Sequence, residues 1–157
     1  MTSRKNRMFV FSVCLAVAAA LAAVFFSSQP GTQSQGLSRG IVAWFLDFFH
    51  LDVSQEIMGW INYFLRRGAH LFIYFCMGLG LTGAFSLQKR LPAWLPAIIL
   101  GVVFAATDEY HQLFSGGRSG KPGDVILDSC GLALGCFVSY LIKRCMEKRE
   151  NENEKLK

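Results

Sequence analysis

Several residues that could do acid–base chemistry lie directly after one long apolar run of this sequence. Asp108 and Glu109 are followed there by His111 and Gln112. Residues three apart share a face of a helix, so Asp108 would lie beside His111. A carboxylate beside an imidazole orients the ring and raises its pKa, which suits a general acid or base. Together with the histidine that begins another apolar run, they give the candidate catalytic residues: His70, Asp108, Glu109 and His111.

A second group of charged residues surrounds the start of the last apolar run. Asp124 and Asp128 are four residues apart, so both fall on one helix face. A carboxylate inside an apolar helix costs a few kcal/mol on insertion scales and normally faces a partner. The natural partners are arginines, and a purely structural ion pair that fixes helix register stays open as the simpler alternative. The candidate ligand-binding residues are Arg67, Gln112, Arg118, Asp124 and Asp128.

The loop between these two groups, residues 115–120, has the sequence SGGRSG and precedes Lys121. Its N–H groups, beside Arg118 and Lys121, could hold a phosphate or a carboxylate. The spacing of a Walker loop is absent. The nearby carboxylates and histidines could instead ligate a metal. However, no two histidines have a known ligand spacing and no cysteine is close, so we predict neither a metal nor a cofactor.

The elements that must position these residues are four long apolar runs, at about 8–26, 70–87, 91–107 and 125–142. At about 1.5 Å per residue, each is close to the roughly 30 Å of a bilayer core. The 157 residues are 52% hydrophobic and 17% charged, which is too apolar for an ordinary soluble domain. Five cysteines are too few, and odd in number, for a secreted disulfide scaffold. We therefore predict an all-α, polytopic membrane helix bundle with four transmembrane helices.

Basic residues indicate the orientation of this bundle. The formal charge is +5, but the Lys and Arg residues gather beside apolar runs as in membrane proteins, so we expect no nucleic-acid partner. With four crossings, the three main clusters share one side, which the positive-inside rule makes cytoplasmic. We predict a multi-pass membrane protein with both termini cytoplasmic, a membrane domain at 1–145 and a charged cytoplasmic tail at 146–157. A cleavable signal peptide is the alternative for the first run, and we favour a retained anchor.

The first outer loop, residues 27–69, contains two amphipathic stretches at about 41–52 and 57–65. Their aromatic residues recur at helical spacing, which predicts two helices in or near the outer membrane interface. Packing against the bundle is the alternative, and Gly59 makes the second helix less secure. Gly131 and Gly135 in the last run predict a close helix contact, either inside the bundle or between copies in a homo-oligomer.

Three segments together form a pattern that is specific in its order and gaps. They are Ser27-Ser28-Gln29-Pro30, Arg67-x-x-His70-x-x-x-Tyr74, and a long block that reads Asp108-Glu109-x-x-Gln112-x-Phe114, Gly117-Arg118 and Asp124-x-x-x-Asp128-x-x-Gly131-x-x-x-Gly135. In these segments the chain resembles the VanZ-like family of bacterial integral membrane proteins. The resemblance implies a protein of the bacterial plasma membrane with a function in the cell envelope. The family's named member is associated with resistance to the glycopeptide antibiotic teicoplanin, without a settled biochemical activity.

Two main functions compete on these observations. In the first, a non-enzymatic protein binds an anionic lipid headgroup or a lipid-linked wall precursor at the outer leaflet, through Arg67 and Arg118. In the second, a membrane-embedded hydrolase or transferase uses His70 or His111 as its base and Arg118 to hold a phosphate or oxyanion. A small transporter is weaker, because four spans without an internal repeat offer little machinery for alternating access. Whether the protein is an enzyme stays open.

Overall fold

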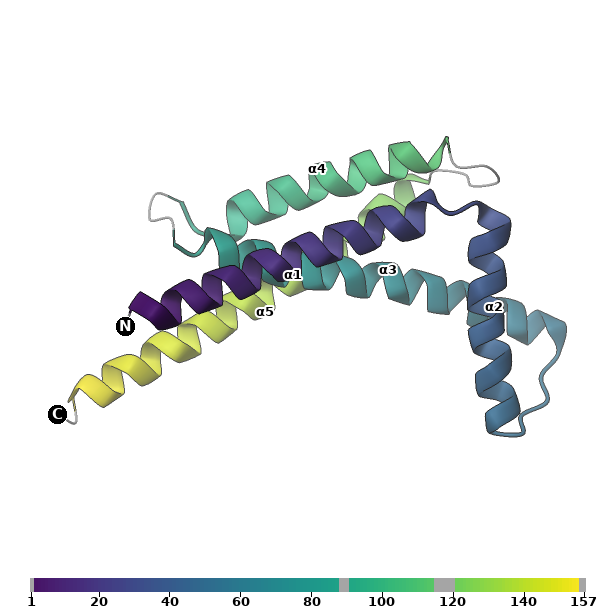
Figure 1. The fold of residues 1–157 in the computed structure, drawn as a ribbon, viewed down its shortest axis with the longest axis horizontal. Coiled ribbons are helices and arrows are strands. Elements are labelled where there is room, and N and C mark those ends of the chain that lie inside the picture. Colours follow the sequence, from purple (N-terminus) through teal and green to yellow (C-terminus); the bar gives the residue numbers. More distant parts are fainter. Residues whose placement is uncertain (1, 88–90, 115–120, 156–157) are drawn as a thin grey trace.

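A computed structural model describes residues 2–87, 91–114 and 121–155 of the chain. These residues form five helices: α1 (Thr2–Ser28), α2 (Gly31–Phe48), α3 (Gln55–Phe85), α4 (Trp94–Gln112) and α5 (Pro122–Lys155). Helices α1, α3, α4 and α5 run lengthwise through the molecule, whereas α2 stands across one end of it (Figure 1). The all-α prediction is confirmed.

Three helices of the described chain are long and apolar enough to cross a membrane. They lie at Asn6–Ser28, Gln55–Phe85 and Pro122–Arg149. The remaining predicted span, 91–107, falls in α4, which has 19 residues and ends in the polar stretch 108–112. Three of the four predicted spans therefore coincide with candidate spans, and the prediction of four is confirmed only to that extent.

Helix α3 is the centre of the packing and contacts each of the other four helices. The core around it is built from small side chains and a few large ones, among them Tyr74, Met77 and Leu132. Small residues let the backbones of α3 and α5 approach closely. A Cβ atom on Gly131 would overlap the carbonyl oxygen of Leu71, and one on Gly135 would overlap that of Phe75. The glycine face of α5 thus packs inside the bundle.

The predicted pair of outer helices differs from the structure. The first is α2, which begins at Gly31, about ten residues before the predicted start. The second is not a separate helix, because α3 continues without a break from Gln55 to Phe85. Glycine in a helix costs only about 1 kcal/mol relative to alanine, so Gly59 weakens the helix without ending it. Ser54 begins α3 by accepting a hydrogen bond from the N–H of Ile57 at 3.3 Å.

A tight turn reverses the chain between α2 and α3. His50 has a φ of 53°, in the left-handed region, which histidine adopts more readily than most residues. The N–H of His50 donates to the carbonyl of Asp47 at 3.0 Å, and the N–H of Leu51 donates to that of Leu46 at 2.9 Å. This pair of bonds is the Schellman arrangement, which satisfies the last carbonyls of α2.

Both chain ends lie at the same end of the bundle (Figure 1). The opposite end holds the end of α1, all of α2, the start of α3, the end of α4 and the start of α5. Most of the predicted site residues belong to these segments. The fold thus brings together, at one end, residues that are distant in the sequence.

Candidate functional site

A polar cavity of about 460 Å³ lies between α2, α3, α4 and the start of α5. Each helix contributes residues at helical spacing, so one face of each helix lines the cavity. Helix α2 contributes Gly31, Gln35 and Arg39, and α4 contributes Glu109 and Gln112. The remaining lining residues are Gly59, Asn62, Tyr63, Arg66, Arg67 and His70 from α3, and Lys121, Asp124, Leu127 and Asp128 from α5 and the residue before it.

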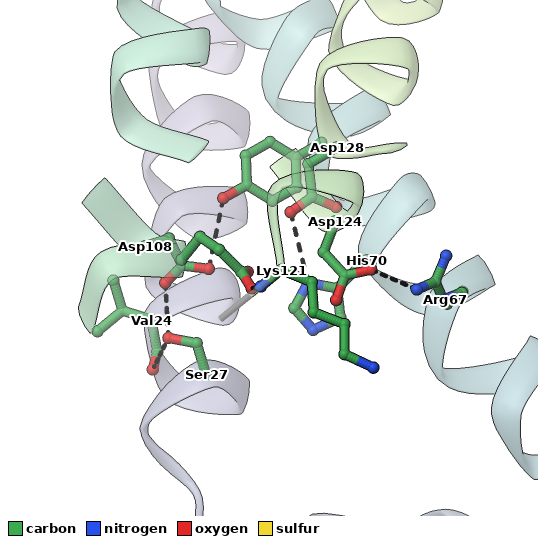
Figure 2. A network of polar contacts seen from close by, with 10 residues as sticks. Val24, Ser27, Arg67, His70, Asp108, Lys121, Asp124 and Asp128 are labelled. Carbon is green, nitrogen blue, oxygen red and sulfur yellow. Dashed lines mark hydrogen bonds and ion pairs between the residues drawn. The ribbon is translucent and has the colours of Figure 1, made fainter. Parts of the chain in front are cut away.

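An ion pair joins two walls of this cavity. The guanidinium of Arg67 lies 2.6 Å from a carboxylate oxygen of Asp124, and both side chains are about one-third exposed. The same guanidinium lies over the ring of Tyr63, 4.7 Å from its centroid. Stacking of this kind holds an arginine in place while leaving some of its N–H groups available. The pair fixes α3 against the start of α5 (Figure 2).

His70 and Asp128 form a second contact between α3 and α5. The Nδ1 atom of His70 lies 3.8 Å from the Oδ2 atom of Asp128, as Figure 2 shows. Asp128 is only 2% exposed, and its other oxygen, Oδ1, has no hydrogen-bond partner among the described residues. The Oδ1 atom of Asn62, in the same cavity wall as His70, is likewise buried without a partner in the part of the chain that the structure describes.

Glu109 connects the end of α4 to the start of α5. Its Oε1 atom accepts a hydrogen bond from the backbone N–H of Lys121 at 2.5 Å. Glu109 is only 6% exposed, so this hydrogen bond lies within the wall of the cavity.

Asp108 belongs to a separate buried network beside the cavity. The hydroxyl of Ser27, in α1, donates to its Oδ1 atom at 2.6 Å, and the hydroxyl of Tyr74, in α3, donates to its Oδ2 atom at 3.4 Å. Asp108 is 5% exposed, and Tyr74 is fully buried. Figure 2 shows Asp108 facing Ser27, so this network joins α1, α3 and α4.

Comparison with known proteins shows the family of this chain. The model of the VanZ/LLP1 family matches residues 9–143, nearly the whole chain. This chain belongs to the VanZ/LLP1 family. A search of curated proteins and a search of solved structures each found no match.

The family resemblance expected from the sequence is thus confirmed. Together with the three candidate spans, it makes the chain a multi-pass membrane protein of the VanZ/LLP1 family.

Most of the predicted site residues of this VanZ/LLP1 protein lie along the one cavity. They are Arg67, His70, Glu109, Gln112, Asp124 and Asp128. Asp108 is in the adjacent network, where its partners are Ser27 and Tyr74 in place of the expected His111. His111 is exposed on α4 and does not line the cavity. Arg118 lies outside the described residues.

The structure also adds residues that the sequence analysis did not single out, namely Gln35, Arg39 and Asn62. Their spacing in the sequence could have indicated that they share one face of a helix. Gly31, Gln35 and Arg39 are each four residues apart, and Asn62 lies four residues before Arg66, which in turn lies four residues before His70. A polar stripe of this kind marks one face of a helix. Residues 31–39 lie before the predicted start of the first outer helix, and Asn62 is surrounded by apolar residues in the stretch 57–65.

The cavity carries basic groups that have no acidic partner. Among the described residues, ion pairs join Arg67 to Asp124 and Lys143 to Glu147, and His70 contacts Asp128. Arg39 and Arg66 line the cavity and belong to none of these pairs. Within residues 2–87, 91–114 and 121–155, no three His, Cys, Asp or Glu side chains are placed to hold a metal ion. The arrangement is therefore suited to binding an anion that carries hydrogen-bonding groups.

Proposed function

We propose that this VanZ/LLP1 protein binds the headgroup of an anionic lipid, or of a lipid-linked wall intermediate, in its polar cavity. The observation that carries this proposal is the cavity of about 460 Å³ in which Arg39 and Arg66 have no acidic partner in the part of the chain that the structure describes. Arginine binds phosphate through several N–H groups at once and is only weakly hydrated, so it suits a partly buried phosphate site.

We propose further that α4 is a fourth membrane crossing and that the cavity faces outward in the bacterial plasma membrane. At about 1.5 Å per residue, the 19 residues of α4 extend about 28 Å, close to the thickness of a bilayer core. Both termini lie at one end of the bundle, near the basic residues of 4–7 and 143–149. The positive-inside rule places that end in the cytoplasm, as part of a membrane domain that covers 1–145.

A pair of C-terminal fusions tests this orientation. We expect a green fluorescent protein fused after Lys157 to fluoresce, because it becomes fluorescent in the cytoplasm. An alkaline phosphatase fused there should be inactive, because it becomes active only outside the cytoplasm. An active phosphatase would place the C-terminus outside and overturn the orientation.

Exposed aromatic side chains on α2 and on the start of α3 support a site for a lipid. Trp44 stacks on Phe48 in α2, and Trp60 stacks on Phe64 in α3, with all four side chains more than half exposed. Aromatic residues of this kind favour the boundary between headgroups and acyl chains. A lipid could place its chains along these surfaces while its headgroup enters the cavity.

Native mass spectrometry tests the proposal directly. Detergent-purified protein is titrated with dioleoyl phosphatidylglycerol and, separately, with dioleoyl phosphatidylcholine. We expect saturable binding of phosphatidylglycerol that Arg66→Gln weakens by about tenfold, since a charge-assisted hydrogen bond contributes about 1.5–3 kcal/mol. Arg144→Gln is the matched control, because Arg144 is exposed on α5 and lies over Tyr140, outside the cavity. Equal losses in the two variants, or no preference for phosphatidylglycerol, would count against the cavity as the site.

The contact between His70 and Asp128 favours a second function, that of a membrane-embedded hydrolase or transferase. Asp128 would hold the imidazole in place while His70 removes a proton from water or from an acceptor hydroxyl. Incubating the wild-type protein and His70→Ala with labelled envelope lipids tests this. Conversion by the wild-type protein alone would establish an enzyme. No conversion by either protein, in conditions where a cell lysate does convert the lipid, would leave binding as the function.

The association of the family with teicoplanin suggests a cellular consequence. We propose that occupancy of the cavity alters access of glycopeptides to the wall precursors outside the membrane. Expression of the wild-type protein should then raise the inhibitory concentration of teicoplanin, and Arg66→Gln should abolish the increase. A rise that is the same for both proteins would separate resistance from the cavity.

A further inference from the structure

Among the described residues, two buried oxygen atoms in the cavity walls have neither a hydrogen-bond donor nor an ion-pair partner. They are Oδ1 of Asp128 and Oδ1 of Asn62, on residues that are 2% and 8% exposed. A buried acceptor without a donor is costly, and in native proteins each such atom calls for an explanation. Both residues line the same cavity, so a ligand in that cavity could supply a missing donor.

The position of these two acceptors relative to Arg66 restricts the shape of a ligand that could bind in the cavity. Asn62, Arg66 and His70 are spaced four residues apart on one face of α3. A rise of about 1.5 Å per residue places Arg66 about 6 Å along the helix from each of the other two. His70 contacts Asp128, so the Asp128 acceptor lies at the His70 end of this row. A cation therefore lies between two acceptor positions.

The charge of the cavity indicates which kind of donor the ligand carries. Four basic side chains line it, namely those of Arg39, Arg66, Arg67 and Lys121, against the three carboxylates of Glu109, Asp124 and Asp128. With Arg67 paired to Asp124, the rest of the lining still favours a net negative ligand. An uncharged hydroxyl supplies a donor without reducing the negative charge of the ligand, whereas an ammonium group would cancel it.

We propose that the ligand of this cavity is a phosphodiester whose headgroup carries free hydroxyl groups. In this arrangement the phosphate lies against Arg66, and the hydroxyls, which lie on one side of the phosphate, donate to the acceptor on that side, Oδ1 of Asp128 or Oδ1 of Asn62. A phosphatidylglycerol headgroup and the sugar phosphate of a lipid-linked wall intermediate share this chemistry. The inference rests on the proposed function, because it specifies what the headgroup must contain.

The test compares two lipids with the same charge. Phosphatidylglycerol and phosphatidylmethanol are both singly charged phosphodiesters, but only the first has hydroxyl donors. In native mass spectrometry of the full chain, we expect phosphatidylglycerol to bind about tenfold more tightly, as the loss of donors to buried acceptors should produce. A polyprenyl-phosphate sugar forms a second arm. Tighter binding of either hydroxylated lipid than of phosphatidylmethanol supports the proposal. Whichever of the two hydroxylated lipids binds more tightly then identifies the source of the headgroup.

Substitutions then locate the donor site. Asn62→Leu removes an acceptor that already lacks a partner, so it leaves no new unpaired group and should not impair folding. If the hydroxyls use Asn62, it should reduce binding of phosphatidylglycerol to the level of phosphatidylmethanol and leave phosphatidylmethanol unchanged. If they use Asp128, Asp128→Leu should abolish the preference while strengthening the binding of phosphatidylmethanol, because a negative charge leaves the cavity, and Asp128→Asn, which keeps an acceptor oxygen, should retain part of the preference. A preference that survives both Asn62→Leu and Asp128→Leu would overturn the proposal. Thr82→Val is the control, because Thr82 is buried in α3 but does not line the cavity.

The outcomes distinguish this inference from the proposed function. Equal binding of phosphatidylglycerol and phosphatidylmethanol, with both weakened by Arg66→Gln, would overturn the hydroxyl requirement and leave the anionic-headgroup site intact. Binding of phosphatidylethanolamine as tightly as phosphatidylglycerol would overturn it in favour of an ammonium donor. Binding of none of these lipids would overturn the proposed function and this inference together.

Discussion

Asp108 and Glu109 are neighbours in the sequence, yet their side chains have different surroundings. Successive helical residues point about 100° apart, so the two carboxyls leave α4 in different directions. Asp108 enters the bundle and accepts from Ser27 and Tyr74, whereas Glu109 reaches the cavity and accepts the N–H of Lys121. The contacts of Asp108 hold the end of α4 against α1 and α3. It is therefore a residue that positions the cavity wall, while Glu109 forms part of that wall.

A serine substitution tests this role of Asp108. We expect Ser27→Ala to lower the free energy of unfolding by about 1–3 kcal/mol, because the buried Oδ1 atom of Asp108 loses a donor. Ser28→Ala is the matched control. Ser28 is exposed and bonds to a carbonyl of its own helix, so its loss should change the free energy by less than about 0.5 kcal/mol. Unfolding of both variants in one detergent measures the difference, and equal effects would contradict the account of this network.

At the scale of the elements, the contact between α3 and α5 determines how closely the cavity walls approach. Gly131 and Gly135 of α5 face backbone atoms of α3 around Leu71 and Phe75, and Gly78 of α3 faces the backbone of α5. Arg67 and His70 lie just before this contact on α3, and Asp124 and Asp128 lie just before it on α5. The close approach therefore sets the separations at which these four side chains pair.

A methyl group added at this contact should force the two helices apart. We expect Gly135→Ala to destabilise the protein by about 1–3 kcal/mol, because its Cβ would overlap backbone atoms that cannot move independently of α3. Gly68→Ala, in α3, is the control. Nothing lies within 4 Å of a Cβ there, and alanine is the better helix former, so this variant should be unchanged or more stable. A thermal melt of each variant measures the effect, and a Gly135→Ala protein as stable as wild type would show that the helices are not in close contact.

The elements were predictable from the sequence where they depend on local pattern. The apolar runs predicted the three helices that can cross a membrane, and Gly131 and Gly135 predicted a close helix contact. The continuity of α3 was not predicted, because hydropathy marks where the apolar residues lie and does not mark where backbone hydrogen bonding stops. Gly59 and Gly68 lower helix propensity, but the helix continues through both.

At the scale of the whole molecule, the cavity depends on segments that are far apart in the sequence. The charged residues around His70, Glu109 and Asp124 could be assigned to one end of the bundle, because each lies at the end of an apolar run. The contribution of α2 could not be predicted in this way. Arg39 reaches the cavity only because α2 stands across the end of the bundle, and no local pattern specifies how a helix outside the apolar runs will lie (Figure 1).

Asp108 has other partners than the predicted His111 for a similar reason, because its contacts depend on tertiary packing. A pattern within α4 can place Asp108 beside His111, but Ser27 lies 81 residues away in the sequence. Only the packing of α1 on α4 brings the two together. Local spacing thus placed most of these polar residues at one end of the bundle, and tertiary packing decided which of them pair.

The central claim is that a lipid headgroup occupies the cavity formed by α2 to α5. The most direct test places a cysteine at Gln35, which lines the cavity and is exposed, after the five native cysteines have been replaced. The rate of its modification by a hydrophilic maleimide is compared in phosphatidylcholine nanodiscs with and without phosphatidylglycerol, with Lys148→Cys as the control at the far end of α5. If a headgroup occupies the cavity, phosphatidylglycerol should slow modification several-fold for Gln35→Cys and leave Lys148→Cys unchanged. An unchanged rate for Gln35→Cys would contradict the central claim.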